Sequence, residues 1–287
     1  RTPIRGTGPP ERPPQAASAI GTSCTNPLVT SDNDYYFRVA YLDDFQGTLL
    51  ANYAKNNLGA KTAAIICDTS DTYAIGLRNY FEAAFGKENI VAEARFNKGD
   101  QEFSAQINAV MEKNPDVIFA PSGYTEGGLL MAEAAKQGYN VPFLAGHTWE
   151  TEPLFQVGVE AASMARFTTF YDSDAEPTAE SEQFLAAYEK MFGGKPKGAV
   201  TALGWDAYMA AVKAIEKAGT TDGPAVRDAL ATLEFDAVTG HIKFDENGDA
   251  IKNRAVVKTV ENGAFKYVDF GPVTPPEAAG SLQFEDE

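Results

Sequence analysis

Cysteine and histidine are scarce in this sequence of 287 residues, which has two of each. Two cysteines cannot build a dense disulfide framework. Cys67 ends an apolar run, where we expect a buried thiol rather than a disulfide to Cys24. His147 and His241 are far apart, and the sequence has neither H-x-x-x-H nor C-x-x-C spacing. The sequence therefore predicts no metal site.

Basic residues are also few. The 24 Lys and Arg side chains stand against 40 Asp and Glu, which gives a formal net charge of -16 and a pI near 4.6. A general nucleic-acid binder needs a basic face to displace counterions from phosphate, and anionic membrane surfaces attract basic rather than acidic segments. No apolar run approaches the roughly 18 residues of a spanning helix. We expect no nucleic-acid partner and no direct membrane insertion.

The common catalytic signatures are missing. There is no G-x-S-x-G elbow, no Walker phosphate loop and no G-x-G-x-x-G after a strand. The acidic stretch 245–249 superficially resembles a calcium loop, but Gly248 is its fourth residue instead of its sixth, and no Glu follows at the twelfth. A hairpin turn is the favoured interpretation there. We predict no catalytic residue and no cofactor, so a binding protein is favoured over an enzyme.

The pattern that is present is an alternation of strands and helices. With 44% hydrophobic residues the chain can bury a sizeable core. From residue 35 to residue 145 short apolar runs alternate with amphipathic stretches, which is typical of βαβ units in a doubly wound parallel α/β sheet. The predicted strands are 35–39, 62–67, 90–94, 116–120 and 142–145, and the predicted helices are 45–58, 77–85, 103–112 and 129–136.

The pattern changes after residue 178. Predicted helices at 179–192, 201–218 and 224–233 precede short strands at 242–244, 255–260 and 265–268. Asn247-Gly248 and Asn262-Gly263 join these strands and predict hairpins, because both central positions of such turns take positive φ. This order indicates two lobes between which the chain passes more than once. The Pro-rich residues 1–19 and the acidic tail 271–287 are expected to be disordered.

Aromatic and polar side chains follow three of the predicted strands. Tyr73 lies after the strand at 62–67, Tyr124 after 116–120, and His147 and Trp149 directly after 142–145. The carboxyl ends of parallel strands meet at one edge of a sheet, so these loops should lie together. Tyr, Trp and a few polar groups are the usual lining of a small-molecule site. The sequence therefore predicts a ligand-binding edge formed by these four residues.

An ordered set of motifs gives the chain a family resemblance. The motifs are Ser-Cys-Thr-Asn-Pro-Leu-Val-Thr (23–30), Tyr-Phe-Arg (36–38), Asp-Asp-Phe-Gln-Gly (43–47), Pro-Asp-Val-Ile-Phe (115–119), Gly-Trp-Asp-Ala (204–207) and Val-Thr-Gly (238–240). Over residues 20–270 the chain resembles the type I periplasmic (solute) binding proteins of ABC importers, in the branched-chain amino acid (Leu/Ile/Val-binding) family.

The resemblance implies a two-lobed α/β fold that closes on a ligand in an interlobe cleft. Residues 20–40 and 172–236 would form a remnant of lobe 1, and residues 41–171 and 237–270 would form lobe 2, with crossings near 38–42, 168–172 and 235–239. The ligand, an amino acid or a related carboxylate or amide, would be held by Ser23, Cys24 and Thr25 on one side. Tyr73, Tyr124, His147 and Trp149 would face it from the other.

The resemblance also implies a partner and a location. The partner would be the membrane permease of an ABC importer. The location would be the periplasm, or the cell surface for a lipoprotein, with a signal peptide expected upstream. An alternative with the same fold is the ligand-sensing domain of a regulator or receptor, and an enzyme using His147 and Glu150 is a more distant one.

Two features depart from the family pattern. The family has an acidic residue at the position of His147, where it pairs with the α-ammonium of the ligand. A His cannot neutralise an ammonium, so the sequence favours a ligand without one unless Glu126 or Glu150 supplies the charge. Family members also carry about a hundred residues of βα units before the Thr25 loop. The first lobe is therefore expected to be incomplete and its ligand binding weakened.

Overall fold

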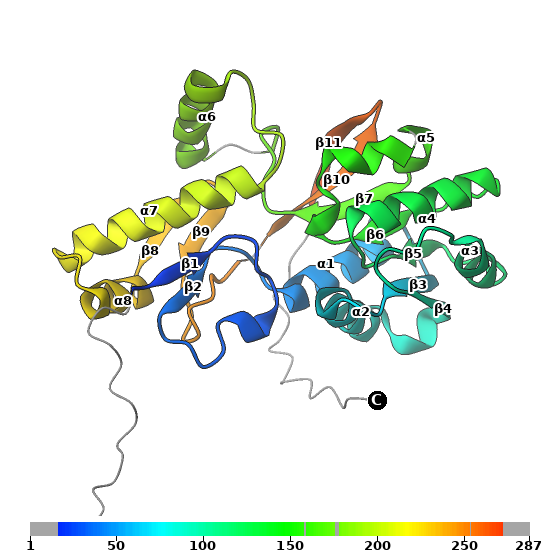
Figure 1. Cartoon of the computed structure of the whole chain (residues 1–287), viewed down its shortest axis with the longest axis horizontal. Helices are drawn as coiled ribbons and strands as arrows, with labels where there is room; N and C mark the ends of the chain where they lie inside the picture. The colour runs from blue at the N-terminus through cyan, green and yellow to red at the C-terminus, as the bar shows by residue number, and fades with distance from the viewer. Residues whose placement is uncertain (1–16, 158, 176–177, 253, 272–287) are drawn as a thin grey trace, which may run out of the picture.

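The computed structural model describes residues 17–157, 159–175, 178–252 and 254–271. These residues form two bodies that lie side by side (Figure 1). One is built around a seven-stranded sheet, and the other combines helices with two pairs of short strands. The segments predicted to be disordered lie mostly outside the described residues, although Ala19 begins a strand and Gly271 ends one.

The large sheet belongs to the first body. Its strands are β3 Ala63–Asp68, β4 Ile90–Phe96, β5 Val117–Phe119, β6 Phe143–Ala145, β7 Ala165–Thr169, β10 Ala255–Glu261 and β11 Ala264–Gly271. They are arranged in the order β11-β10-β7-β6-β5-β3-β4. Strands β3 to β7 are parallel, whereas β10 is antiparallel to both β7 and β11. This confirms the predicted parallel sheet and the antiparallel pair predicted at 255–260 and 265–268, whereas residues 240–243 pair with 234–237 in the other body.

Helices cover both faces of this sheet. Their bounds are α1 Asp43–Asn56, α2 Thr72–Phe85, α3 Ser104–Met111, α4 Tyr124–Lys136 and α5 Val159–Ala162, with short 3-10 helices at Lys87–Asn89, His147–Trp149 and Glu152–Val157. The first two helices pack on one face, and α3, α4 and α5 pack on the other. The sheet is therefore doubly wound, as predicted.

Strand β3 shows how the sequence encodes this layering. Ala63, Ile65 and Cys67 join the core under α1 and α2, whereas Ala64 and Ile66 join the core under α3 and α4. Successive side chains of a strand point to opposite faces, so a strand covered on both faces has a continuous apolar sequence. Both cysteines are free thiols, which agrees with the expected absence of a disulfide.

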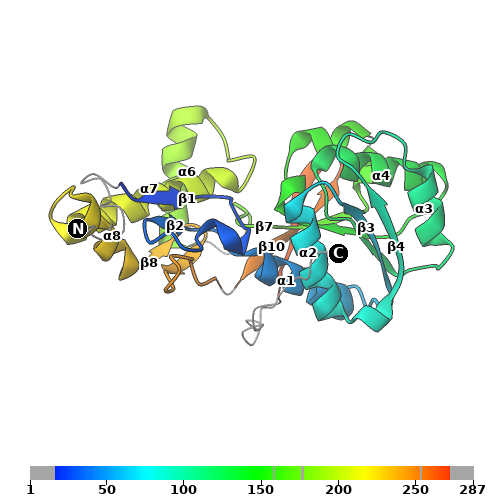
Figure 2. The ribbon, with the colours of Figure 1, turned by 60° about the horizontal axis from the view of Figure 1, so that its bottom comes forward.

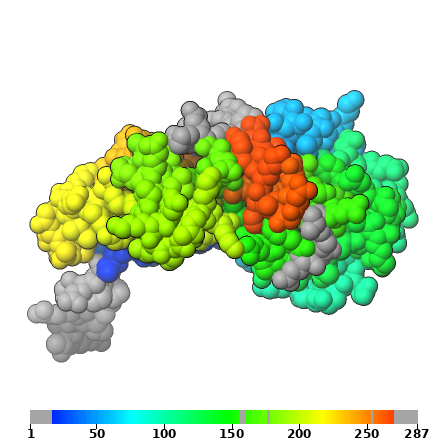
Figure 3. Space-filling model, turned by 90° about the horizontal axis from the view of Figure 1, so that it is seen from above, coloured from blue at the N-terminus to red at the C-terminus, as the bar shows by residue number. Residues whose placement is uncertain are grey.

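The second body is richer in helix. Its elements are β1 Ala19–Gly21, a 3-10 helix at Pro27–Val29, β2 Tyr36–Arg38, α6 Ala179–Phe192, α7 Val200–Ala218, α8 Gly223–Ala231, β8 Glu234–Ala237 and β9 Gly240–Lys243. Strands β1 and β2 are parallel, and β8 and β9 are antiparallel. The long α7 lies along these strands, and α6 stands out beside it (Figures 1 and 2). From above, the yellow-green α6 region lies between the yellow end of this body and the orange β10–β11 hairpin (Figure 3).

The chain passes between the bodies after β2, after β7 and after β9. The first two passages include the predicted positions 38–42 and 168–172. The third predicted position, 235–239, is wrong because these residues form β8 and its turn, and Glu234 pairs with Lys243. The chain joins the large sheet only at Ala255. Residues 237–243 therefore lie with the second body, not with the first as predicted.

The two Asn-Gly pairs form turns of different kinds. Asn262 and Gly263 both have positive φ, 52° and 72°, and close the β10–β11 hairpin as predicted. In the other pair Gly248 alone has a positive φ, and its N–H donates to the Asp245 carbonyl at 3.1 Å. The Asp245 carboxylate accepts two backbone N–H groups of the turn, each at 2.9 Å. This acidic stretch is therefore a capped turn closed by an antiparallel bridge between Phe244 and Ala250, and the prediction that it joins strands 242–244 and 255–260 in a hairpin is wrong, because β9 pairs with β8.

Two glycines inside helices test how closely α1 and α2 pack. A Cβ added to Gly47 in α1 would lie 2.6 Å from the Tyr80 Cβ and 3.0 Å from the Phe81 backbone nitrogen, whereas a Cβ added to Gly76 in α2 meets nothing within 4 Å. We expect Gly47→Ala to lower the free energy of unfolding by about 1–3 kcal/mol through overpacking. Gly76→Ala should raise it by about 0.5–1 kcal/mol through helix propensity. Denaturant unfolding measures both, and equal effects would contradict this close packing.

Candidate functional site

The predicted ligand-binding edge lies where strands of the large sheet end and helices begin. Tyr73 is in the first turn of α2, which follows β3, and Tyr124 is the first residue of α4, which follows β5. His147 begins a 3-10 helix just after β6. The Asp71 side chain caps α2 by accepting the Tyr73 backbone N–H at 2.9 Å. Three strand ends therefore contribute these side chains to one edge, as the sequence predicts.

Tyr73 and His147 meet at this edge beside a buried glutamine. The Tyr73 hydroxyl lies 3.4 Å from His147 Nδ1, and the ring centroids are 5.4 Å apart. Gln46 of α1 is fully buried, and its Oε1 accepts the His147 backbone N–H at 2.9 Å. Its Nε2 donates to the Tyr73 hydroxyl at 3.3 Å, and the Thr168 hydroxyl of β7 donates to its Oε1 at 2.8 Å. Gln46, which the sequence analysis did not select, thus links α1, α2, β7 and the loop after β6.

Tyr73 and His147 are both neutral near neutral pH. Burial lowers the pKa of His147 to about 4, because protein atoms replace the water that would solvate an imidazolium. Burial likewise raises the pKa of Tyr73 well above its usual value. His147 is half-buried, and its ring lies 5.0 Å from that of Phe170, centroid to centroid. The pair therefore presents hydrogen-bonding groups and ring surface without net charge.

The loop around Thr25 approaches this pair from the second body. Thr25 is buried, its carbonyl oxygen accepts the Asp43 backbone N–H at 3.0 Å, and its side chain hydrogen-bonds to the Asp43 carboxyl group. Gln46 Nε2 also donates to Asp43 Oδ1, at 3.3 Å. Asp43 and Gln46 therefore connect the Thr25 loop to the pair formed by Tyr73 and His147, and the structure brings these predicted residues together.

Arg38 fixes the shape of the same loop from β2. Its guanidinium is fully buried and forms an ion pair with Asp249. It also donates to four oxygens of the loop, the carbonyls of Cys24 (2.9 Å), Asn26 (2.6 Å) and Pro27 (3.3 Å) and the Thr30 hydroxyl (3.1 Å). Ser23 and Cys24, two predicted ligand residues, are half-buried within this loop. The loop carbonyls therefore face Arg38.

Trp149 is separated from the other predicted site residues. Its side chain is fully buried, and its indole N–H donates to the Ser122 hydroxyl at 3.3 Å. A Cβ on Gly127 of α4 would clash with its ring. Trp149 does not line the ligand-binding edge with the other predicted residues, because its ring is part of the core under α3 and α4. Tyr124 is 39% exposed and stays accessible.

The two glutamates considered as partners for a ligand ammonium are already engaged. Glu126 is buried, and its Oε1 accepts the Gly99 N–H at 3.0 Å. Glu150 accepts the Thr169 hydroxyl at 2.6 Å and the Ala199 N–H at 2.8 Å. The expectation that either one supplies charge to a ligand is therefore not supported by this arrangement.

Glu150 also belongs to a buried ionic cluster between the two bodies. It forms an ion pair with Lys258 of β10, and the Lys258 ammonium lies 2.8 Å from Asp172, which follows β7. Ala199, whose N–H Glu150 accepts, is the residue before α7 in the second body. The cluster therefore ties the loop after β6 to the second body.

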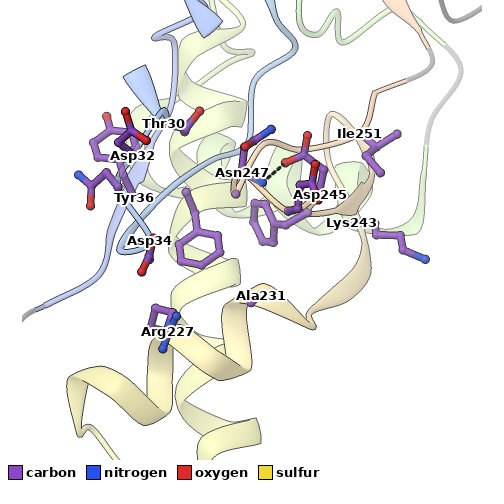
Figure 4. A pocket seen from close by; sticks show the side chains of 15 residues that line it. Thr30, Asp32, Asp34, Tyr36, Arg227, Ala231, Lys243, Asp245, Asn247 and Ile251 are labelled. Atoms are coloured by element: carbon purple, nitrogen blue, oxygen red, sulfur yellow. Dashed lines mark hydrogen bonds between the residues drawn. The ribbon is translucent and has the colours of Figure 1, made fainter. Parts of the chain in front are cut away.

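A separate cavity of about 500 Å³ lies on the second body (Figure 4). Side chains of both charges line it, among them Asp32, Asp34, Arg227 and Lys243. The dashed bond in Figure 4 joins the Asp245 carboxylate to a backbone N–H of its turn. None of its lining residues is a predicted ligand residue. In the described ranges no group of three His, Cys, Asp or Glu side chains is suited to hold a metal, and no helix has the length and apolar character that a membrane crossing requires.

Comparison with known proteins identifies the family. A family model described as periplasmic binding protein matches residues 17–264. The chain belongs to the periplasmic binding protein family. This confirms the predicted family and fold class.

Two solved structures of such proteins are similar to this periplasmic binding protein. A leucine-binding protein from Thermotoga maritima is 35% identical with a TM-score of 0.82, and the match covers 89% of this chain and 73% of that one. A branched-chain amino acid transporter substrate-binding protein from Streptococcus pneumoniae, solved in complex with isoleucine, is 30% identical with a TM-score of 0.79. That match covers 88% of this chain and 72% of the other.

A curated relative is more distant in sequence. The leucine-, isoleucine-, valine-, threonine- and alanine-binding protein of Pseudomonas aeruginosa is 26% identical over 239 residues, which is 82% of this chain. The chain spans 62% of the length of that relative and 56% of the length of a Leu/Ile/Val-binding protein from Rhizobium johnstonii.

The ionic cluster of this periplasmic binding protein gives a matched pair of variants. Glu150→Gln leaves the buried Lys258 with Asp172 as its remaining charged partner, and we expect the free energy of unfolding to fall by about 1–3 kcal/mol. Glu152→Gln should change it by less than about 0.5 kcal/mol, because Glu152 and its partner Lys197 are 63% and 80% exposed. Urea unfolding compares the two, and similar losses would contradict a stabilising role of the cluster.

Asp43 makes stability depend on pH. Burial raises its pKa to about 7, an effect that its hydrogen bond to Thr25 and the charge of Arg38 partly offset. Between about pH 4 and 7 the folded chain then holds a proton that the unfolded chain has lost, so this group makes the protein less stable as pH rises. Asp43→Asn should remove that decline, gaining stability over the wild type toward pH 7 by up to about 4 kcal/mol.

Chemical denaturation at several pH values measures this difference. The exposed Asp32→Asn is the control and should leave the profile as in the wild type, since Asp32 lies outside the buried network. A difference between Asp43→Asn and the wild type that does not change with pH would contradict the assignment.

Proposed function

We propose that this chain binds an amino acid or a related carboxylate or amide between its two bodies, and that it serves as the substrate-binding component of an ABC importer. The observation that carries the proposal is the network that joins the Thr25 loop of the second body to Tyr73 and His147 of the first through Asp43 and Gln46. Groups from both bodies thus converge on one place, which suits a ligand that bridges them.

The division of the chain follows from the same proposal. One lobe consists of the described residues within 17–40 and 172–251, and the other of those within 41–171 and 255–271. Ligand binding favours the closed arrangement through contacts that exist only when both lobes touch the ligand. No covalent step is involved. The boundary near residue 251 replaces the one predicted at residue 237.

Five of the predicted residues receive a role in this scheme. Backbone N–H groups at Ser23, Cys24 and Thr25 bind the ligand carboxylate, a role that suits a loop whose carbonyl oxygens are taken up by Arg38. Tyr73 contributes its hydroxyl and ring edge. The exposed Tyr124 covers the ligand from the side of α4.

The chemical class of the ligand is supported by the relatives. The proteins from Thermotoga maritima, Streptococcus pneumoniae and Pseudomonas aeruginosa are named for leucine or for branched-chain and other amino acids. The same family membership supports a membrane permease as partner and the periplasm or the cell surface as location.

A thermal-shift screen followed by calorimetry tests the proposal. The probes are leucine, isoleucine, valine, their amides and benzoate. A ligand at a thousand times its dissociation constant adds about 4 kcal/mol of stability, so a binding probe should raise the melting temperature by several degrees. A flat screen on a chain that melts cooperatively would contradict the proposed function.

Tyr124 gives the matching test of the site. We expect Tyr124→Ala to weaken binding of the best probe by about fivefold or more, because a buried aromatic contact is worth more than about 1 kcal/mol. Tyr208→Ala on α7 is the control: Tyr208 is 65% exposed and lies in the second body, away from the strand ends. Affinities within twofold for both variants would place the ligand elsewhere.

A further inference from the structure

The orientation of the Gln46 amide is fixed by its neighbours. The His147 backbone N–H, 2.9 Å from Oε1, can only donate, and it therefore requires the carbonyl oxygen at that end. The opposite end faces Asp43 Oδ1 and the Tyr73 hydroxyl, both at 3.3 Å and both able to accept from an NH₂ group. If the amide were rotated by half a turn, its NH₂ group would face the His147 backbone N–H, and two donors would oppose each other. A single orientation satisfies every contact.

That orientation selects one tautomer of His147. The ring nitrogen Nδ1 lies 3.3 Å from Gln46 Oε1. A bare Nδ1 would point its lone pair at the lone pairs of this oxygen, whereas an Nδ1–H donates to it. The Tyr73 hydroxyl, 3.4 Å from the same nitrogen, is the competing partner, because it could donate to a bare Nδ1. An Nδ1–H suits both neighbours, because Gln46 Oε1 can only accept whereas the Tyr73 hydroxyl can accept as well as donate, so the proton belongs on Nδ1.

The second ring nitrogen is then left with its lone pair. In a neutral imidazole one nitrogen donates and the other accepts, so an Nδ1–H makes Nε2 an acceptor. Among the described residues we find no hydrogen-bond partner for His147 Nε2, and the side chain is half-buried at the ligand-binding edge. The acceptor is therefore available to a ligand.

We propose that Gln46 is a positioning residue that holds His147 as its Nδ1–H tautomer, so that Nε2 accepts a hydrogen bond from an N–H donor of the ligand, an α-ammonium or an amide. This inference rests on the proposed function, since it names the ligand group that the same site selects. It reverses the expectation from the sequence that a histidine at position 147 disfavours an ammonium. A neutral acceptor attracts a cationic donor, whereas it offers nothing to a second carboxylate.

Nitrogen-15 NMR of the histidine side chains tests the tautomer without any ligand. The whole chain is labelled at histidine and recorded at pH 7, and a His241→Gln variant assigns the two rings. We expect His147 to show a protonated Nδ1 and a bare Nε2. A bare Nδ1 with a protonated Nε2 would overturn the proposal. It would mean that the Tyr73 hydroxyl donates its hydrogen bond to Nδ1.

Two variants separate the role of Gln46 from general stability. Gln46→Met removes the amide and should yield a mixture of tautomers, whereas Thr168→Val removes another donor to the same oxygen and should keep the Nδ1–H form. Thermal melts accompany both spectra. If Gln46→Met does not fold, the spectrum of the wild type still decides. Unchanged tautomers in a folded Gln46→Met would contradict positioning by Gln46.

Binding of leucine and of 4-methylpentanoate, which is leucine without its ammonium, tests the ligand group. We expect the wild type to prefer leucine by roughly tenfold or more, the usual worth of a hydrogen bond to a charged group. His147→Phe keeps the ring surface, and it should lose most of this preference by weakening leucine alone. Equal affinities of the wild type for both probes would contradict the role of His147. A chain that binds neither of these probes nor any compound of the thermal-shift screen would instead contradict the proposed function.

Discussion

The buried ion pair between Arg38 and Asp249 is the interaction on which the second body and its Thr25 loop depend. The two residues are 211 positions apart in the chain, and one side chain is fully buried while the other is nearly so. A buried guanidinium without partners is strongly destabilising, so β2, the loop at 24–30 and the turn at 245–249 must form together. Asp249 also accepts the Thr30 hydroxyl at 2.9 Å, which closes the network around the loop.

This constraint extends to the candidate site through the backbone. The loop that Arg38 holds by its carbonyl oxygens continues to Thr25, whose own carbonyl receives the Asp43 N–H at the start of α1. Asp43 in turn contacts Gln46, one helical turn further along α1. The position of α1 relative to β2 is thus set by polar contacts on both sides of the passage between the bodies. The candidate site therefore lies beside the passage from β2 to α1, where polar contacts already fix the backbone.

The sequence predicted the parts of this structure that depend on local patterns. Continuous apolar runs such as 62–67 mark strands covered on both faces, and the residues that follow them, Tyr73 and His147, lie at the expected edge. Trp149 follows the same strand as His147 but is buried. An aromatic residue after a strand has the same sequence signal whether its ring enters the core or the ligand edge. Trp149 enters the core because Gly127 of α4 has no side chain and leaves room for its ring.

Long-range partners account for what the sequence did not reveal. Gln46 and Asp43 look like ordinary polar residues in the first turns of a helix, and their importance comes from partners as far as 122 positions away. The sequence also misplaced the third passage between the bodies, at 235–239, because it did not reveal the pairing of β8 with β9. Strand β8 has four residues, Glu234–Ala237, and its alternation of exposed and covered side chains is too short to stand out in the sequence.

The same network explains why a neutral residue is suited to position 147. Burial already raises the pKa of Asp43 to about 7, which means that this region stabilises an additional anion poorly. A carboxylate at position 147, next to the same Gln46 amide, would add a second buried negative charge that repels the first. A neutral imidazole supplies an acceptor at that point without the cost of burying another charge. In the proposed binding mode a ligand ammonium meets an uncharged acceptor at His147, and the Asp43 carboxyl group lies one contact further away, beyond the Gln46 amide.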